Sequence, residues 1–310
     1  MMNTPKVSII MAAYNRANTL PRAIDSVLRS DMQEWELIIV DDGSTDNTRA
    51  VIESYLLKDS RIHAAFHDRN LHVLAAKNTG FDLMKGEWFT TLDSDDEMLP
   101  SALTEMLQLL ETVSPDIDAI TCNCLDSTTG ELSGLGLDHD QWLDFDKLVT
   151  KCSGEHWGLT KRSLLGINRF NSKMRGGGEG ILWWKISSNA KRYYLHKALR
   201  IYHTEGIDRI SSKTKKVNLG DRIGFYKELA SETEYLALQK QYRQFEYAVS
   251  QRNIDLAMAM AILGRRAEAW KAYREAKKNL SGLYRFAVLF AVLFGRLPAQ
   301  FVVKVALKTR

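Results

Sequence analysis

The sequence predicts an α/β fold in which a mostly parallel sheet is flanked by helices and followed by a helical C-terminal extension. Over the first hundred residues, short apolar runs without a helical period alternate with segments whose apolar residues recur every three or four positions. Alternation of strands and helices along a chain is typical of a parallel sheet with right-handed crossovers. Beyond about residue 217, the chain becomes rich in Ala, Glu, Lys, Gln and Leu, which favour helices.

Each expected element follows from its own pattern. Residues 7–11 are apolar except for Ser8, as in a parallel strand that is covered on both faces. Residues 19–30 carry apolar side chains at helical spacing, and Gly86 separates a later helix from the strand that begins at Trp88. The other expected strands cover 36–40, 62–66, 88–92 and 118–125, and the other expected helices cover 46–57, 73–84, 101–112 and 181–188.

Four acidic residues, Asp93, Asp95, Asp96 and Glu97, follow the strand at 88–92 within five positions. Carboxylates this close repel one another unless a cation or hydrogen-bond donors compensate. Their oxygens suit Mg2+ or Mn2+, which usually keep waters and bind substrate phosphates as well. The alternative is an acidic turn in which Asp95 or Asp96 caps a helix ahead of Pro100.

A second acidic pair, Asp41 and Asp42, follows the strand at 36–40. Parallel strands bring these tips to the same sheet edge as Asp93 and Asp95, where open α/β sheets bind their ligands. The turn at 12–16 lacks the glycines of a dinucleotide-binding loop, and the sequence contains no P-loop. We therefore expect a metal, rather than a backbone cradle, to neutralise a bound phosphate.

Four motifs in order resemble family 2 glycosyltransferases. They are residues 7–10 with Tyr14-Asn15, residues 39–46, residues 76–80 and residues 92–96. The resemblance extends over about residues 5–212. It implies a GT-A fold and inversion at the anomeric centre of a nucleotide-activated sugar.

The resemblance also implies roles for individual residues. Asp95 matches the metal ligand of the family's DxD motif, and Lys77 stands where an arginine is common, as a nucleotide or diphosphate contact. Asp42 would accept a hydrogen bond from the base edge. The complete set implied for nucleotide-sugar binding is Ala12, Tyr14, Asn15, Asp42, Lys77, Asp93, Ser94 and Arg209.

The resemblance places the catalytic base near a glycine-rich stretch at 175–180. Glu179 matches the acid of the family's Glu-Asp pair, although Gly180 replaces the aspartate, and Asp138 and Glu155 are the reserve candidates. An inverting transfer needs a carboxylate that removes the proton of the acceptor hydroxyl. His203 resembles a residue of the family's closing loop that completes the metal shell, beside Arg209.

The charge distribution is uneven along the chain. The formal net charge is +4, but residues 264–310 contain eleven Lys and Arg against two Glu. Within this region, residues 283–307 alternate aromatic and aliphatic side chains with only basic charges, as in a helix at a membrane interface. A helix packed on the catalytic domain is the alternative. No apolar run reaches the roughly 20 residues of a membrane span, and the N-terminus lacks the pattern of a signal peptide.

Three cysteines provide no disulfide framework and fit a reducing compartment. Cys122 and Cys124 share one face of a strand without nearby His ligands, which favours packing over zinc binding. We expect a catalytic domain at 1–216 and a helical region at 217–310 in a cytoplasmic protein, with a peripheral membrane location through the tail.

The predicted function is an inverting glycosyltransferase that uses a divalent metal and a nucleoside-diphosphate sugar, with UDP favoured. The expected acceptor is a glycan or lipid-linked glycan of bacterial surface polysaccharide assembly, and no nucleic-acid partner is expected. The alternatives are a sugar nucleotidyltransferase, which would need a Gly-rich basic loop after the first strand, and a non-catalytic nucleotide-sugar-binding scaffold, which Gly180 favours.

Overall fold

The computed structural model describes residues 4–172, 179–204, 254, 257, 258, 260–276, 282–295 and 298. The chain divides into two compact units, Met1–Ser172 with Leu182–Gly206, and Lys173–Ile181 with Ile207–Arg310. The expectations for Arg209 and for the glycines at 176–178 lie outside the described residues.

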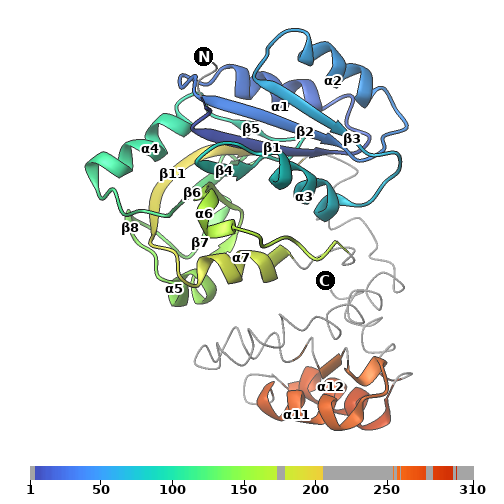
Figure 1. Ribbon diagram of the computed structural model, residues 1–310. Coiled ribbons are helices and arrows are strands. Elements are labelled where there is room, and N and C mark those ends of the chain that lie inside the picture. Colours follow the sequence, from blue (N-terminus) through green and yellow to red (C-terminus); the bar gives the residue numbers. More distant parts are fainter. Residues whose placement is uncertain are drawn as a thin grey trace. The chain divides into compact units, whose positions relative to one another are not determined.

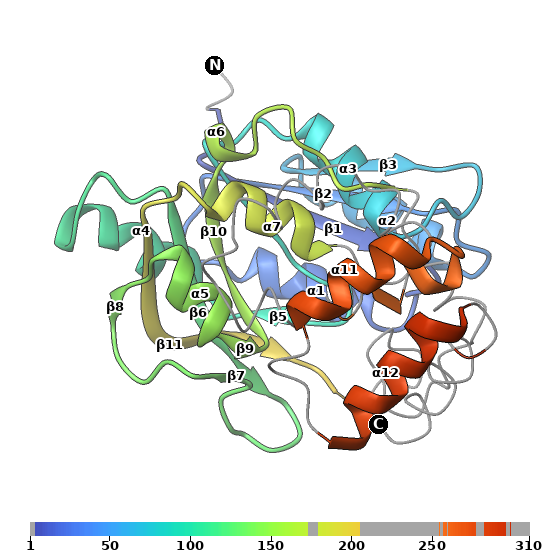
Figure 2. The same cartoon turned by 90° about the horizontal axis from the view of Figure 1, so that it is seen from below.

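Four parallel strands form the N-terminal half of the large sheet, in the order β3 (Ile62–Phe66), β2 (Trp35–Asp41), β1 (Val7–Ala13) and β4 (Trp88–Thr91). Helices α1 (Leu20–Leu28) and α2 (Thr48–Leu56) connect strands in one direction along the sheet, and α3 (Val73–Leu83) returns in the other. Right-handed crossovers in opposite directions lie on opposite faces. Accordingly, α3 covers β1 and β2 on one face, while α1 and α2 lie on the other (Figures 1 and 2). The predicted strands and helices of this half are confirmed.

The second half of the sheet is mixed. Antiparallel β10 (His156–Lys161) pairs with β4 and with β6 (Ala119–Asp126), and β6 pairs in parallel with β11 (Arg192–Tyr202). The short strands β5 (Glu97–Met98) and β8 (Gln141–Trp142) both pair antiparallel with β11, and β7 (Gly134–Leu135) pairs with β9 (Ser153–Gly154). The remaining helices of this half are α4 (Ala102–Thr112), α5 (Phe145–Thr150), α6 (Arg162–Leu165) and α7 (Glu179–Ser187).

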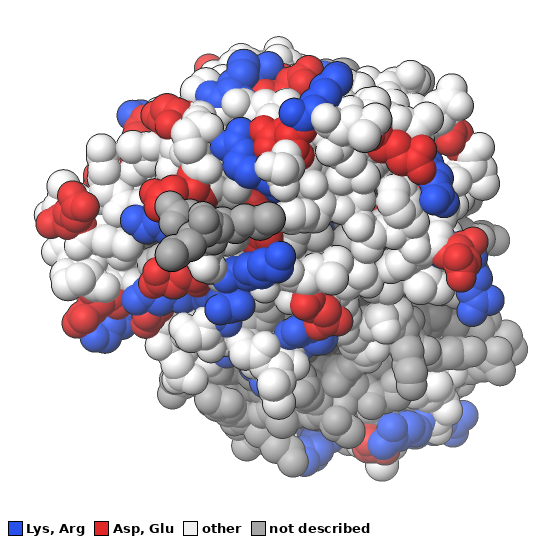
Figure 3. Space-filling model, turned by 45° about the horizontal axis from the view of Figure 1, so that its top comes forward, with Lys and Arg blue, Asp and Glu red and all other residues white. Residues whose placement is uncertain are grey.

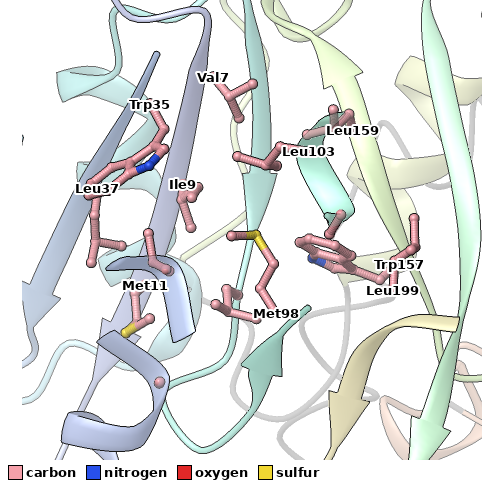
Figure 4. Packing of buried hydrophobic residues seen from close by; sticks show 14 of the residues in the cluster. Val7, Ile9, Met11, Trp35, Leu37, Met98, Leu103, Trp157, Leu159 and Leu199 are labelled. Atoms are coloured by element: carbon pink, nitrogen blue, oxygen red, sulfur yellow. The ribbon is translucent and has the colours of Figure 1, made fainter. Parts of the chain in front are cut away.

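One large hydrophobic core extends along both halves of the sheet, and Leu137, Leu143 and Tyr194 form a separate, smaller cluster. Alternate residues of β1 point to one face, where they meet side chains of β2 and of the later elements (Figure 4). Both faces of β1 and β2 are covered, which explains why these strands are apolar along almost their whole length. The labelled members are Val7, Ile9, Met11, Trp35, Leu37, Met98, Leu103, Trp157, Leu159 and Leu199.

Cys122 and Cys124 belong to this core, as the sequence predicts. Burial raises the pKa of both thiols, that of Cys124 to about 12, so neither is poised to bind zinc as a thiolate. Among the residues that the structure describes, no group of three or more His, Cys, Asp and Glu is arranged to hold a metal. On the face shown in Figure 3, acidic and basic side chains are intermixed.

The second unit contains α11 (Arg266–Ala276) and α12 (Gly282–Phe294). Gly295 follows α12 with a φ of 83°, the left-handed conformation that commonly ends a helix. One face of α12 is buried, but Phe286, Phe290 and other large apolar side chains remain exposed. None of the described helices is long and apolar enough to cross a bilayer.

Candidate active site

Three loops meet where β2, β1 and β4 end. The amide of Asp42 donates to the carbonyl of Ala13 (2.8 Å), and the amide of Leu92 donates to the carbonyl of Ile10 (2.9 Å). These bonds continue the ladders of the parallel strands past their last regular residues. They bring the segments that begin at Asp42 and Asp93 to the same edge of the sheet, as the sequence predicts.

Asn15 joins the first loop to the second. Its amide donates to the hydroxyl of Ser44 (2.9 Å), and its side-chain oxygen accepts from the amide of Thr45 (2.8 Å). Its φ of 54° is left-handed, a conformation that asparagine tolerates better than most residues. The neighbouring Tyr14 is exposed, and Ala12 lies at a partly exposed position near the end of β1.

Asp42 is buried at the tip of β2, and its carboxylate accepts hydrogen bonds from the segment that follows β3. Its Oδ1 accepts from Nδ1 of His67 (2.7 Å) and from the amide of Leu71 (2.9 Å). His67 follows β3 directly, and its Nε2 lies 3.0 Å from Oγ1 of Thr79 in α3. His67 was not predicted from the sequence, although its place at the end of a parallel strand was the available signal.

Asp93 lies between two cations. Its Oδ1 is 3.8 Å from Nζ of Lys77, its Oδ2 accepts from Nη2 of Arg200 (2.7 Å), and its side chain is 47% exposed. Desolvation acts to raise the pKa of Asp93, but the charges of Lys77, Arg200 and Arg16 outweigh it and lower the pKa. Asp93 is therefore ionised at neutral pH. Lys77 is buried within α3 although it carries a charge, and its ammonium group lies beside Asp93.

Asp96 is fully buried against Arg200. Nε of Arg200 donates to Oδ2 of Asp96 (2.8 Å), Nη2 contacts the same oxygen, and the amide of His203 donates to Oδ1 (2.8 Å). Burial raises the pKa of Asp96 to about 6, with the charge of Arg200 opposing and that of Asp93 adding to the shift. Arg200 was not predicted, and its basic side chain between the apolar residues Leu199 and Ile201 of β11 was the available signal.

Neither Asp95 nor Asp96 caps α4, so that alternative is wrong. The helix begins at Ala102 with Ser101 at its N-cap position, because the intervening residues form β5. Glu97, the first residue of β5, forms an ion pair with Arg29 (3.0 Å) and lies 2.9 Å from Nε2 of His203. Ser94 is buried between the two aspartates of the motif.

Comparisons with known proteins agree with this geometry. The family model described as Glycosyl transferase family 2 matches residues 8–148. The chain is 35% identical over 219 residues to the GalNAc(5)-diNAcBac-PP-undecaprenol beta-1,3-glucosyltransferase of Campylobacter jejuni, an alignment covering 68% of this chain and 69% of the relative. The chain belongs to glycosyl transferase family 2. The chain is also 41% identical over 107 residues to the putative colanic acid biosynthesis glycosyl transferase WcaA of Escherichia coli. That alignment covers 34% of this chain and 38% of WcaA.

Solved structures support the fold of this glycosyltransferase. The crystal structure of S. aureus TarS 1–349 in complex with UDP-GlcNAc superposes with a TM-score of 0.70 at 16% identity, covering 98% of this chain and 92% of that one. The mannosyltransferase PcManGT from Pyrobaculum calidifontis, in complex with GDP-Man and Mn2+, gives a TM-score of 0.55 at 16% identity, covering 99% of this chain and 87% of that one. The predicted GT-A fold with C-terminal helices is confirmed.

The chemistry of the acidic segment fits a hard divalent cation. The carboxylate of Asp95 is partly exposed and has no hydrogen-bond or ion-pair partner among the described residues, and the neighbouring Asp93 is ionised and half exposed. Two carboxylates plus waters and diphosphate oxygens form a ligand set that suits Mg2+ or Mn2+. His203 as a metal ligand stays a prediction, and in this structure its Nε2 faces Glu97.

The predicted base, Glu179, is the first residue of α7, so the expected helix after the glycines is confirmed. Its catalytic role stays a prediction. From Leu182 onward, α7 belongs to the first unit, where Trp183 stacks with Phe89 and Trp184 meets Phe145 edge-on. Of the reserve candidates, Asp138 is exposed and contacts His139 (2.6 Å). Its pKa is lowered, first by that hydrogen bond, which makes it a poor proton acceptor.

Proposed function

We propose that this glycosyltransferase inverts the anomeric centre of a UDP-sugar and transfers the sugar to a hydroxyl of a lipid-linked glycan during surface polysaccharide assembly. The observation that carries the proposal is that one strand tip presents a buried hydrogen-bond acceptor, while another presents a cluster of charged side chains. Asp42 is buried at the tip of β2, and Asp93, with Lys77 and Arg200, follows β4 on the other side of β1. A nucleoside diphosphate has the matching polarity, with a neutral base that donates hydrogen bonds and an anionic diphosphate.

The donor would bind across this edge of the sheet. Tyr14 and Asn15 would line the nucleoside, Asp42 would accept from the base, and Ser94 and Asp93 would lie near the ribose and diphosphate. Lys77 and Arg209 would neutralise phosphate oxygens. Asp95, with Asp93 nearby, would hold Mg2+ or Mn2+, which when bound stabilises the charge that develops on the leaving diphosphate.

Glu179 would act as the general base. Its carboxylate takes the proton of the acceptor hydroxyl while the hydroxyl oxygen bonds to the anomeric carbon and the bond to the diphosphate breaks on the opposite face. The acceptor class is supported by the Campylobacter jejuni relative, whose name specifies an undecaprenol diphosphate glycan. The name of the Escherichia coli relative refers to colanic acid biosynthesis.

Asp95→Asn tests the donor site. With Mn2+ present, we expect UDP-sugars to raise the melting temperature of the wild type, and the full-length protein to release UDP slowly by donor hydrolysis. D95N should retain the wild-type melting temperature without ligand but lose at least about 10²-fold of the hydrolysis rate. Equal rates for D95N and the wild type would contradict the assignment, and so would full activity in EDTA.

We also propose that the C-terminal region binds anionic membrane surfaces through α12. The exposed side chains Phe286, Phe290, Leu293 and Phe294 recur at helical spacing and form one apolar face. Exposed Arg285 precedes this face, and the guanidinium of Arg266 lies beside Gly295 at its far end. Apolar residues flanked by guanidinium groups suit a helix lying in the interface of a bilayer with anionic headgroups.

Vesicle sedimentation tests the membrane proposal. The full-length protein should sediment with vesicles that contain phosphatidylglycerol and much less with pure phosphatidylcholine vesicles. Phe290→Ser should reduce sedimentation several-fold, whereas Leu57→Ser, which changes the highly exposed Leu57 just beyond α2, should not. Equal sedimentation of the two variants would exclude α12 as the membrane-binding face.

A further inference from the structure

The buried carboxylate of Asp42 offers its two oxygens unequally. Oδ1 accepts two hydrogen bonds, from Nδ1 of His67 at 2.7 Å and from the amide of Leu71 at 2.9 Å, which occupies both of its lone pairs. Oδ2 has no donor among the described residues. Because an ionised carboxylate only accepts hydrogen bonds, Nδ1 of His67 carries the proton in this contact.

The imidazole of His67 is fixed at both nitrogens. Its Nε2 lies 3.0 Å from Oγ1 of Thr79, which is anchored on α3, and its side chain is only 12% exposed. The backbone is fixed as well, because the amide of His67 donates to the carbonyl of Asp41 (2.9 Å). The ring therefore cannot turn away from Asp42 without breaking a hydrogen bond to the sheet or to α3.

The loop that supplies the second donor is also constrained. A Cβ atom on Gly43, next to Asp42, would lie 2.5 Å from the carbonyl carbon of Arg69, so this loop packs directly on the backbone of Gly43. Leu71 follows two residues later and is held in position to donate to Asp42. The carboxylate is thus clamped from two sides in a single orientation.

When both lone pairs of one carboxylate oxygen are already occupied by hydrogen bonds, only the other oxygen can accept a hydrogen bond from an N–H of a base. Uracil and thymine present a single N–H between two carbonyls, and Oδ2 of Asp42 suffices for it. Guanine presents two adjacent donors, N1–H and N2–H, which pair best with both oxygens of a carboxylate. Binding guanine in that way would require Oδ1 to give up the hydrogen bond from His67 or from Leu71.

We propose that His67 is a positioning residue that reserves Oδ2 of Asp42 for the N3–H of a uracil or thymine base and so favours uracil and thymine nucleotides over guanine nucleotides as sugar donors. This inference rests on the proposed function, because it assumes that Asp42 faces the base of the donor. His67 does not contact the base itself. It acts through Asp42, by holding one oxygen away from the ligand.

Titration calorimetry in the presence of Mn2+ tests this role with three ligands: UDP, GDP and N3-methyl-UDP, which lacks the N3–H. The full-length wild type should bind UDP roughly ten- to a hundredfold more tightly than either other ligand, the effect of a hydrogen bond to a charged acceptor. In His67→Phe, the preference for UDP over N3-methyl-UDP should fall below about threefold. His67→Gln, which can still donate one N–H to Asp42, should recover a larger preference than H67F.

The matched control is His63→Gln in β3, the strand that His67 follows, where the half-exposed imidazole lies 3.7 Å from Glu36. It should keep the wild-type preference. If H67F does not fold, Thr79→Val removes the hydroxyl that contacts Nε2 of His67. This variant should reduce the preference for UDP over N3-methyl-UDP at least twofold. An unchanged preference in the folded variants overturns the role of His67.

The ligand series separates the two hypotheses. If the wild type binds none of the three nucleotides, the proposed donor class fails. If it binds UDP and N3-methyl-UDP equally, the contact between Asp42 and the base fails. If it prefers GDP to UDP, the preference for uracil over guanine is overturned although nucleotide binding stands.

Discussion

Replacing Arg200 with methionine should destabilise the first unit strongly. The guanidinium of Arg200 is almost fully buried and is shared by Asp93 and Asp96. Methionine keeps much of the side-chain length but removes the charge. Among the described residues, Asp96 would then retain only the amide of His203 as a donor. Removing one partner of a buried ion pair costs about 3–5 kcal/mol, because it leaves an uncompensated charge.

The expected loss lies near the low end of this range. The side chain of Asp93 is 47% exposed, so water can replace Arg200 there and that contact contributes little. The cost then comes mainly from Asp96, which has no access to water. We expect R200M to lower the free energy of unfolding by about 3 kcal/mol at neutral pH.

Urea unfolding followed by tryptophan fluorescence measures this loss. Six of the seven tryptophans, all except Trp270, lie in the residues of the first unit, so the signal reports on it. Asp96→Asn in the R200M background should recover about 2 kcal/mol, because the amide removes the unpaired charge and still accepts from His203. The control Arg169→Met breaks the exposed pair with Asp82 and should cost less than about 1 kcal/mol.

Two results would refute this reasoning. One is a loss in R200M no larger than that of Arg169→Met. The other is a double variant that is as unstable as the sum of its single substitutions, since this would show that Arg200 and Asp96 are not coupled.

Three further predictions concern a glycine, a histidine and the metal. Gly43→Ala should cost at least about 1 kcal/mol more than Gly130→Ala in urea unfolding; both have φ near 70°, but only the Cβ at Gly43 would clash, with Arg69. Burial lowers the pKa of His156, so the unfolded chain binds a proton at this residue more readily than the folded chain does. The wild type should therefore lose unfolding free energy as the pH falls below about 6.5. In His156→Gln this loss should be absent, so the unfolding free energy of the variant should depend less on pH. EDTA should abolish the thermal shift caused by UDP-sugars without changing the melting temperature of the free protein, and Mn2+ should restore it; a shift that survives EDTA would contradict metal-assisted binding through Asp95.

Local patterns were sufficient for the first half of the fold. The apolar runs at 7–11 and 36–40 have no helical period, and both became buried parallel strands because helices cover both faces of the sheet. The antiparallel β10 was not predicted. It pairs with β4 and β6 across long stretches of sequence, and its own pattern, with Trp157, Leu159 and polar neighbours, does not reveal its partners.

The sequence was sufficient to predict the site residues that lie directly after the parallel strands. Asp42 and Asp93 were assigned because parallel strands bring their ends to one edge, which requires no knowledge of side-chain contacts. His67 and Arg200 were missed, because their importance arises from hydrogen bonds to residues 25 and more than 100 positions away in the chain. A single sequence carries no signal that would pair them.

The structure separates four acids that the sequence presents as one cluster. Asp96 is buried under Arg200, and Glu97 is bound to Arg29 and His203, so both are committed to holding β5 and β11 together. Only Asp93 and Asp95 remain exposed to a ligand. The repulsion that makes the motif conspicuous in the sequence is thus relieved by protein cations at Asp93, Asp96 and Glu97. Asp93 stays half exposed beside Lys77 and Arg200, and the partly exposed carboxylate of Asp95 has no ion-pair partner among the described residues, so these two acids are the ones that a cation arriving with the diphosphate can reach.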